Sequence, residues 1–281
     1  MTEALSLAVA LTALVAVMGS AIGSFLNVVI YRVPLGLSVV APPSACPGCS
    51  SGISPRDNVP VLSWVALRGK CRNCRTSISV RYPIVEAVTG ILFIVVALRF
   101  LPALTASSSV TEVVSGVLVL VAFLYFMATS VALSAIDLDV HRLPDRIVLP
   151  GYLVGAVLLG AAALTVGDVG ALIRLAAGGA IFFVFYLVLA FAYPGGMGLG
   201  DVKLAGVIGI FLGFLGWEQL IVGAAAAFIL GGIASAVLII IRKAGRRSGI
   251  PFGPWMLGGA WVAIVAGSTI AGAYLSLVGL N

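Results

Sequence analysis

Repeated apolar runs, separated by short polar stretches, constrain this chain more than any other feature of its sequence. A helix that crosses a bilayer needs about 20 mostly apolar residues. Only 9% of the 281 residues are charged and 61% are hydrophobic, whereas about a quarter of the residues in a soluble domain are charged. The sequence therefore predicts an all-α polytopic membrane protein in a lipid bilayer. About eight transmembrane helices are expected, at residues 5–30, 83–101, 112–136, 146–166, 170–193, 202–216, 218–241 and 254–278.

The basic residues are distributed unevenly along the chain. In a soluble protein a net charge of +6 would indicate nucleic-acid binding, but 14 of the 16 Lys and Arg residues fall in only four stretches. An eight-helix topology places all four stretches on one side of the membrane: 31–82, 137–146, 194–203 and 242–253. Because cytoplasmic loops are enriched in Lys and Arg, we expect these stretches in the cytoplasm, both termini outside and no nucleic-acid partner.

The N-terminal segment is interpreted as a retained membrane helix. A secretory signal peptide begins with a positively charged region. The first 30 residues carry Glu3 and no Lys or Arg. We therefore assign residues 1–30 to a first transmembrane helix.

Four cysteines, the only ones in the chain, lie in the first cytoplasmic loop. They form two pairs, CPGC and CRNC, about twenty residues apart: Cys46, Cys49, Cys71 and Cys74. Two such pairs match the tetrahedral thiolate ligation of Zn²⁺, and the reducing cytoplasm disfavours disulfides. We expect residues 31–82 to form a small loop domain around a structural zinc ion, with free thiols or a redox pair as the alternatives.

Two aspartates are predicted to meet at the cytoplasmic end of the bundle. Asp137 and Asp201 are 64 positions apart, and the two helices between them return the chain to the same side. Carboxylates in membrane segments are costly and therefore indicate function. Two neighbouring carboxyl groups can share one proton, so that one activates water while the other protonates the substrate. The alternative is that both are helix caps or interface residues.

The residues next to these aspartates have distinct expected roles. The stretch GMGLGDVKLAG contains Gly196, Gly198 and Gly200, which should permit an unwound strand along which an extended substrate could lie. Lys203 should point away from Asp201 on a helix, as an interface anchor or as an electrostatic influence. Asp145 is expected to cap a helix.

Other polar residues near the site remain open. Asp139 should lie on a different face from Asp137, and His141 is interpreted as a loop residue rather than a catalytic one. Asn27 either contacts substrate or forms a hydrogen bond between helices.

Six motifs in order resemble the type IV prepilin peptidases, which belong to the GxGD aspartic proteases. They are GSFLNVVIYRVP (23–34), the two CxxC pairs, RYPIVEAVTG (81–90), IDLDVHRLPD (136–145), GMGLGDVKL (196–204) and IPFGPWMLGGA (250–260). The resemblance covers nearly the full chain. It implies that Asp137 and Asp201 are the catalytic pair, and that residues 83–281 form the peptidase domain.

The resemblance also implies a substrate and a second activity. The expected substrates are prepilins or pseudopilins, cut after a Gly that ends a short basic leader, at the cytoplasmic face of the inner membrane. Methylation of the new N-terminal residue with S-adenosylmethionine is implied for the region that includes the zinc loop. Glu86 is either part of that methyl-transfer site or a polar contact that packs the loop. No glycine-rich dinucleotide-type fingerprint follows a predicted strand.

Two other functions fit part of the pattern. A proton-coupled transporter could use the two aspartates as a relay, because transporters also contain broken helices and intramembrane acids. A GxGD protease with non-pilin substrates would use the same pair. The absence of a clear internal repeat in the sequence disfavours the transporter.

Overall fold

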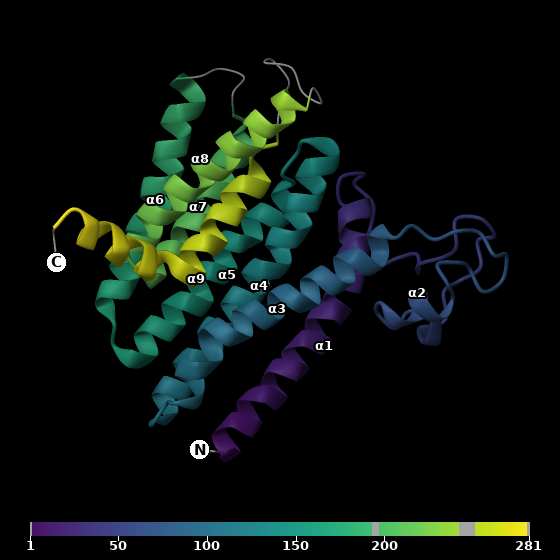
Figure 1. Ribbon diagram of the computed structural model, residues 1–281, viewed down its shortest axis with the longest axis horizontal. Helices are drawn as coiled ribbons and strands as arrows, with labels where there is room; N and C mark the ends of the chain where they lie inside the picture. The colour runs from purple at the N-terminus through teal and green to yellow at the C-terminus, as the bar shows by residue number, and fades with distance from the viewer. Residues whose placement is uncertain (1, 193–196, 242–250, 280–281) are drawn as a thin grey trace. The chain divides into compact units, whose positions relative to one another are not determined.

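The chain folds into helices joined by short connections, as the apolar runs predict. The computed structural model describes residues 2–192, 197–241 and 251–279, with side chains from residue 6 onward. Within these ranges there is no β-strand, only two isolated β-bridges. The long helices, labelled in Figure 1, are α1 (Thr2–Arg32), α3 (Arg81–Thr105), α4 (Val110–Val140), α5 (Asp145–Val166), α6 (Val169–Ala192), α7 (Leu199–Leu215), α8 (Trp217–Ile240) and α9 (Gly253–Leu277).

Seven of the helices in the described ranges are long and apolar enough to cross a membrane. The exception is α7, whose 17 residues give a length of about 26 Å at 1.5 Å per residue, slightly less than the roughly 30 Å of a hydrocarbon core. The chain is therefore an all-helical polytopic membrane protein with seven candidate spans, one fewer than the eight expected.

The first compact unit comprises Met1–Ser108 and Phe123–Ala132. Its two long helices, α1 and α3, run side by side (Figure 1). Glycines make this approach close: a side chain at Gly23 would meet the backbone of Glu86, and one at Gly90 would meet the Ser20 hydroxyl. Small residues at such crossings let membrane helices pack by backbone contact.

The loop between α1 and α3 belongs to this first unit. It contains a 3₁₀ turn (Pro55–Asp57) and the short helix α2 (Leu62–Ala66). Asn27 near the end of α1 donates a hydrogen bond to the Tyr82 carbonyl at the start of α3 (3.2 Å). Asn27 therefore makes the contact between helices that was one of its two expected roles.

The second compact unit comprises Ser109–Ala122 and Leu133–Asn281. Its central element is α7, which contacts α5, α6, α8 and α9 and is buried continuously from Leu204 to Gly213. A helix that is apolar all round needs such complete burial. Gly209 and Gly213 bring α7 against the backbone of α6, so the helix that carries Asp201 is tightly held.

Two helix ends differ from the sequence prediction. Helix α4 continues to Val140 rather than ending near 136, and His141 ends it in a left-handed conformation (φ 51°). Helix α7 begins at Leu199 rather than 202, because the Asp201 carboxylate at the third helical position accepts the Gly198 N–H and so caps an earlier first turn. Asp137 and Asp201 therefore both lie within terminal helical turns, the last of α4 and the first of α7.

Candidate active site and metal site

Asp137 lies in the last turn of α4, with its side chain turned into the second unit. It is only 5% exposed, and one carboxylate oxygen accepts a hydrogen bond from the Gly253 amide at 3.0 Å. That amide belongs to the first residue of α9, where backbone N–H groups have no partner within the helix. The carboxylate therefore takes the place of a helix cap for α9. Asp139, two residues later, is exposed, as the helical prediction required.

Asp201 lies in the first turn of α7 and is bound in a similar way. Its carboxylate accepts a hydrogen bond from the Gly198 amide at 3.0 Å. Gly198 precedes the helix in an extended conformation (φ −86°, ψ 156°). Each of the two aspartates thus accepts one backbone N–H at the N-terminus of a helix, where the helix dipole favours negative charge.

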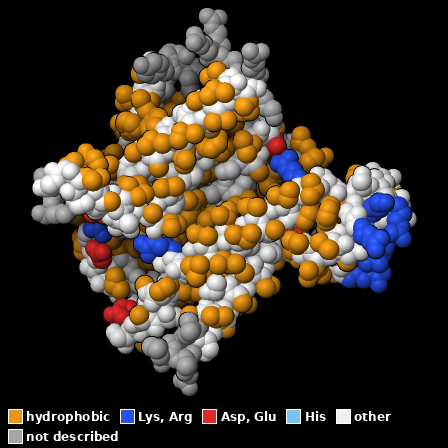
Figure 2. Space-filling model, in the orientation of Figure 1, with side chains coloured by type: hydrophobic (Ala, Val, Ile, Leu, Met, Phe, Trp, Pro, Cys, Tyr) orange, Lys and Arg blue, Asp and Glu red, His pale blue; other side chains and the backbone are white. Residues whose placement is uncertain are grey.

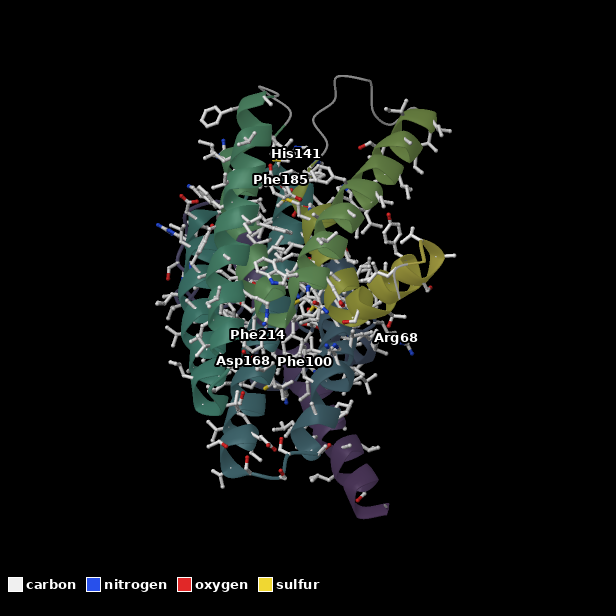
Figure 3. All side chains as sticks on the ribbon, turned by 90° about the vertical axis from the view of Figure 1, so that its left-hand side faces the viewer. Arg68, Phe100, His141, Asp168, Phe185 and Phe214 are labelled. Atoms are coloured by element: carbon white, nitrogen blue, oxygen red, sulfur yellow. The ribbon has the colours of Figure 1, made fainter. Side chains whose placement is uncertain are left out.

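The two aspartates lie close together within the second unit. Leu143 contacts both glycines beside them: a Cβ at Gly200 would lie 3.1 Å from the Leu143 Cβ, and one at Gly253 would lie 3.2 Å from its Cδ2. The Asp137 and Asp201 carboxyl groups also interact electrostatically. In Figure 3, His141, which ends the helix that carries Asp137, lies toward one end of this unit, and Asp168 lies toward the other. The structure thus brings together the two residues predicted to form a dyad.

The glycine prediction is only partly met. Gly198 has the extended backbone expected before the helix, but Gly200 is helical and packs against Leu143. The unwound segment was expected to reach Asp201 and stops at Gly198, because α7 begins one turn earlier than predicted. Gly196 lies outside the described residues.

Lys203 points away from Asp201 and pairs with Asp145. Its ammonium lies 2.9 Å from both carboxylate oxygens. Asp145 was expected to cap α5, which is wrong, since Pro144 occupies the cap position and Asp145 is the first helical residue. The Tyr152 hydroxyl donates to the Lys203 carbonyl at 2.7 Å. These contacts join α5 to the first turn of α7, next to Asp201.

An aromatic cluster includes a tyrosine that interacts with Asp201. Tyr186 of α6 is buried and interacts electrostatically with Asp201. Its ring stacks on Phe228 of α8, with centroids 5.8 Å apart, and Phe252, just before α9, lies 5.5 Å from Phe228. Phe185 meets Phe228 edge-on and is 43% exposed. Aromatic side chains therefore extend from the dyad to the surface of the second unit.

The four cysteines gather into one cluster within the loop of the first unit. Their sulfur atoms all lie within 4.8 Å of one another, and Cys46 Sγ is 3.7 Å from Cys74 Sγ. A tetrahedral ion with 2.3 Å metal–sulfur bonds requires sulfurs about 3.8 Å apart. The donor set therefore fits a four-coordinate metal ion.

The two cysteine pairs adopt the same local fold, shifted by 25 residues. In each, the first cysteine N–H bonds the carbonyl five residues later, 2.9 Å in both (Ser51 and Thr76). In each, the residue after the second cysteine is left-handed: Ser50 (φ 55°) and Arg75 (φ 62°). The sequence showed no clear repeat because segments 44–53 and 69–78 share little beyond the cysteines and a final Ile.

Hydrogen bonds around the second pair favour thiolates. The Thr76 side chain lowers the pKa of the Cys74 thiol to about 6, and the Cys74 and Asn73 amides lower the pKa of Cys71. Arg72 donates to both oxygens of Asp57 at 2.6–3.0 Å, which ties this pair to the 3₁₀ turn and lowers the pKa of Asp57. Metal ligation needs thiolates, which these contacts favour at Cys71 and Cys74, whereas burial and the neighbouring Cys71 and Cys74 thiols raise the pKa of Cys46 to about 11.

Glu86 attaches the loop to α3. Its carboxylate, 8% exposed, accepts the Val61 N–H at 2.7 Å. Val61 is a β-branched residue at φ 61°, ψ −50°, in a strained γ-turn closed by the Leu62 N–H and the Pro60 carbonyl (2.6 Å). Glu86 thus makes a polar contact that packs the loop, one of its two expected roles.

Comparison with known proteins bears on both units. A family described as the bacterial peptidase A24 N-terminal domain matches residues 17–100, and the type IV leader peptidase family matches residues 124–236. A prepilin leader peptidase/N-methyltransferase from Aeromonas salmonicida is 33% identical, aligned over 92% of this chain and 91% of its own length.

The chain belongs to the type IV leader peptidase family. Two further relatives carry the same name. The one from Pseudomonas putida is 33% identical over 95% of this chain and 94% of its own length, and the one from Pseudomonas aeruginosa is 32% identical over 94% and 93%. No solved structure matches the chain.

Several residues around the two aspartates were not assigned roles from the sequence. Gly253 donates to Asp137, Leu143 contacts Gly200 and Gly253 next to the two aspartates, and Tyr186 interacts electrostatically with Asp201. The Phe-Gly-Pro sequence at the start of α9 carried a usable signal for Gly253. A glycine at the first position of a helix has a free N–H and no side chain to keep a carboxylate away.

Proposed function

We propose that this member of the type IV leader peptidase family removes the basic leader of prepilins or pseudopilins and methylates the new N-terminus. The observation that carries the peptidase assignment is the arrangement of Asp137 and Asp201. Two carboxyl groups from different helices lie within electrostatic reach, and each is oriented by a backbone amide. Lys203, the lysine nearest in sequence to Asp201, is bound to Asp145 instead, and His141 interacts electrostatically with Asp137.

The reaction follows from a proton shared by the dyad. Two adjacent carboxyl groups cannot both ionise cheaply, so one holds a proton at neutral pH. The ionised carboxylate takes a proton from water, which attacks the scissile carbonyl carbon, while the other carboxyl group protonates the carbonyl oxygen. The gem-diol then collapses as the leaving amine takes a proton. The Gly198 and Gly253 amides keep the carboxyl groups in place throughout.

We propose that the dyad faces the cytoplasm, with both chain termini outside. Helix α9 begins beside Asp137. Because α8 precedes α9 and is long enough to cross the membrane, α8 must start at the far end of the unit and end on the dyad side. Helix α7 must then run from the dyad end to the far end, despite its 17 residues. Counting α7 as a crossing restores the eight-helix topology and places the basic stretches on the dyad side. A leader at the cytoplasmic face would meet the dyad there.

The metal bound by Cys46, Cys49, Cys71 and Cys74 is proposed to be zinc. The thiolate set fits Zn²⁺, and four protein ligands leave no position for substrate, so zinc would hold the two cysteine pairs together. S-adenosylmethionine would supply the methyl group. The carboxylate of Glu86, the residue predicted for this cofactor, is engaged by the Val61 amide, so the described residues do not assign a site for it.

Mass spectrometry of a co-expressed prepilin tests both activities. Asp137→Asn or Asp201→Asn should leave the enzyme folded, with unchanged metal content, while cleavage falls by about 10³-fold or more, since the dyad loses its shared proton. Asp139→Asn is the matched control, because Asp139 is exposed on the same helical turn and should leave cleavage intact. Wild-type processing by either dyad variant would overturn the site. Mature pilin without an added methyl group would overturn the second activity alone.

A further inference from the structure

A basic hollow lies beside α2 in the loop of the first unit, apart from the aspartate dyad. It has a volume of about 430 Å³ and is lined by Ala66, Leu67, Arg68, Lys70, Arg72 and Arg75. Figure 2 shows Lys and Arg side chains gathered over this loop, and Figure 3 shows Arg68 at its outer surface. Neither peptide cleavage nor the thiolate metal site uses these side chains.

Most of the charge in the hollow is uncompensated. Arg72 is neutralised by Asp57, which it binds through two nitrogens. The other three basic residues, Arg68, Lys70 and Arg75, have no carboxylate within 4.0 Å among the described residues. The hollow therefore presents about three positive charges to whatever occupies it, which selects an anion.

The backbone places two of these arginines in conformations that arginine rarely adopts. Arg68 has φ 53° and Arg75 has φ 62°, in the left-handed region that costs a non-glycine residue roughly 1 kcal/mol. Glycine or asparagine would fit both positions better. The cysteine cluster fixes Arg75, which follows Cys74 directly. The fold of the cysteine pair accounts for the conformation of Arg75, because Ser50 has it at the equivalent position of the first pair, so only the strain at Arg68 points to a use for a side chain of this hollow.

The loop is attached near the start of α3, a candidate membrane-spanning helix. Glu86, which binds the Val61 amide, lies five residues into α3, or about 8 Å along the helix from Arg81. Helix α2 begins immediately after Val61, and its Leu62 and Val65 side chains are 68% and 60% exposed. A short helix with exposed apolar side chains, held next to a membrane helix, belongs at the boundary between headgroups and acyl chains.

We propose that the hollow binds the headgroup phosphate of an anionic phospholipid, with Leu62 and Val65 lying against its acyl chains. Arg68 and Arg75 hold the phosphate as forked donors, a geometry that suits arginine, and Lys70 adds a point charge. The bound lipid anchors the loop domain to the membrane leaflet next to α1 and α3, the helices that the loop connects. This site goes beyond leader cleavage and methylation, and it does not depend on either.

Lipid titration of the full chain in a non-ionic detergent tests the proposal. A fluorescent short-chain phosphatidylglycerol is the probe, and anisotropy reports binding. Each basic residue near an anionic lipid contributes about a fivefold change in affinity. Arg75→Gln should therefore weaken binding about fivefold, and Arg68→Gln with Arg75→Gln about 25-fold. Arg56→Gln is the matched control, since Arg56 is exposed on the same loop outside the hollow, and it should change affinity less than twofold.

Further measurements separate the sources of the anion. Phosphatidylcholine of equal chain length should bind at least tenfold more weakly, and millimolar inorganic phosphate should not displace the probe. The metal content of each variant shows whether it keeps the cysteine cluster. Independently of the variants, increasing salt should weaken lipid binding to the wild-type chain. Equal binding of phosphatidylcholine, displacement by phosphate, salt-independent binding, or an Arg68/Arg75 double variant that binds like wild type would overturn the proposal.

Discussion

Gly253→Ala should disable the dyad without altering either aspartate. The new Cβ would lie 2.8 Å from the Asp137 carboxylate oxygen that now accepts the Gly253 N–H at 3.0 Å. An ordinary contact needs 3.4 Å or more, so the oxygen must retreat by about half an ångström, and the hydrogen bond approaches the 3.5 Å limit at which it is lost. A hydrogen bond to a charged group contributes about 1.5–3 kcal/mol. If it acts fully in the transition state, cleavage should slow about 10- to 150-fold.

Single-turnover cleavage of purified prepilin by full-length enzyme measures this effect. Gly258→Ala is the matched control, because it lies on the same helix and its Cβ would meet only the Leu230 Cδ1 at 3.4 Å. It should leave the rate unchanged and slightly stabilise α9. Thermal unfolding of both variants shows whether overpacking has affected the whole unit. A Gly253→Ala enzyme that cleaves at the wild-type rate would show that the Asp137–Gly253 contact has no part in the reaction.

Three further predictions concern contacts around the two sites. Lys203→Met should cost less than about 1 kcal/mol of stability, since the Lys203 and Asp145 side chains are 38% and 53% exposed. A double-mutant cycle with Asp145→Asn measures the coupling energy of the pair. A coupling energy of several kcal/mol would contradict this prediction. Cys74→Ser should lower bound metal from one ion per chain toward none, as measured by elemental mass spectrometry; full retention would mean that the other three ligands suffice. Glu86→Ala should leave the Val61 amide unpaired, at about 1–3 kcal/mol, and speed proteolysis of the loop, whereas Glu86→Gln keeps an acceptor and should restore resistance.

The sequence predicted that the two aspartates meet because the side of the membrane on which a residue lies follows from the number of helices that precede it. Two helices separate Asp137 from Asp201, and a chain that crosses twice returns to the same side. The cost of placing a carboxylate in a membrane segment then favoured a functional role for both acids. Helical periodicity also placed Asp139 on a different face, and the exposed position of Asp139 in α4 confirms it. The cysteine cluster could also be predicted from the sequence, because the spacing of the two cysteine pairs is typical of metal ligands.

The residues that support these sites were not predictable in the same way. Lys203 and Asp145 pair across 58 positions, and nothing in the local pattern around either residue names the other. Gly253 and Asp137 are 116 positions apart. The end of α4 and the start of α7 were misplaced by four and three residues, because hydrogen bonds at the helix ends, from the His141 N–H to the Asp137 carbonyl and from the Gly198 N–H to Asp201, carry the helices beyond their apolar runs. Such contacts depend on how the helices pack, which hydrophobic periodicity does not specify.

The way the fold holds its two acids agrees with the chemistry proposed for them. A lysine or arginine beside the dyad would stabilise both carboxylates as anions and remove the proton that one of them must donate. The chain instead keeps its nearest lysine, Lys203, occupied by Asp145 and gives each dyad aspartate one amide from a helix N-terminus. An amide orients a carboxylate and carries only part of a charge. Gly253 is therefore needed for a backbone N–H that no side chain obstructs, since a Cβ there would lie 2.8 Å from the Asp137 oxygen, whereas a Cβ at Gly198 would meet the Asp201 oxygen at an ordinary 3.5 Å.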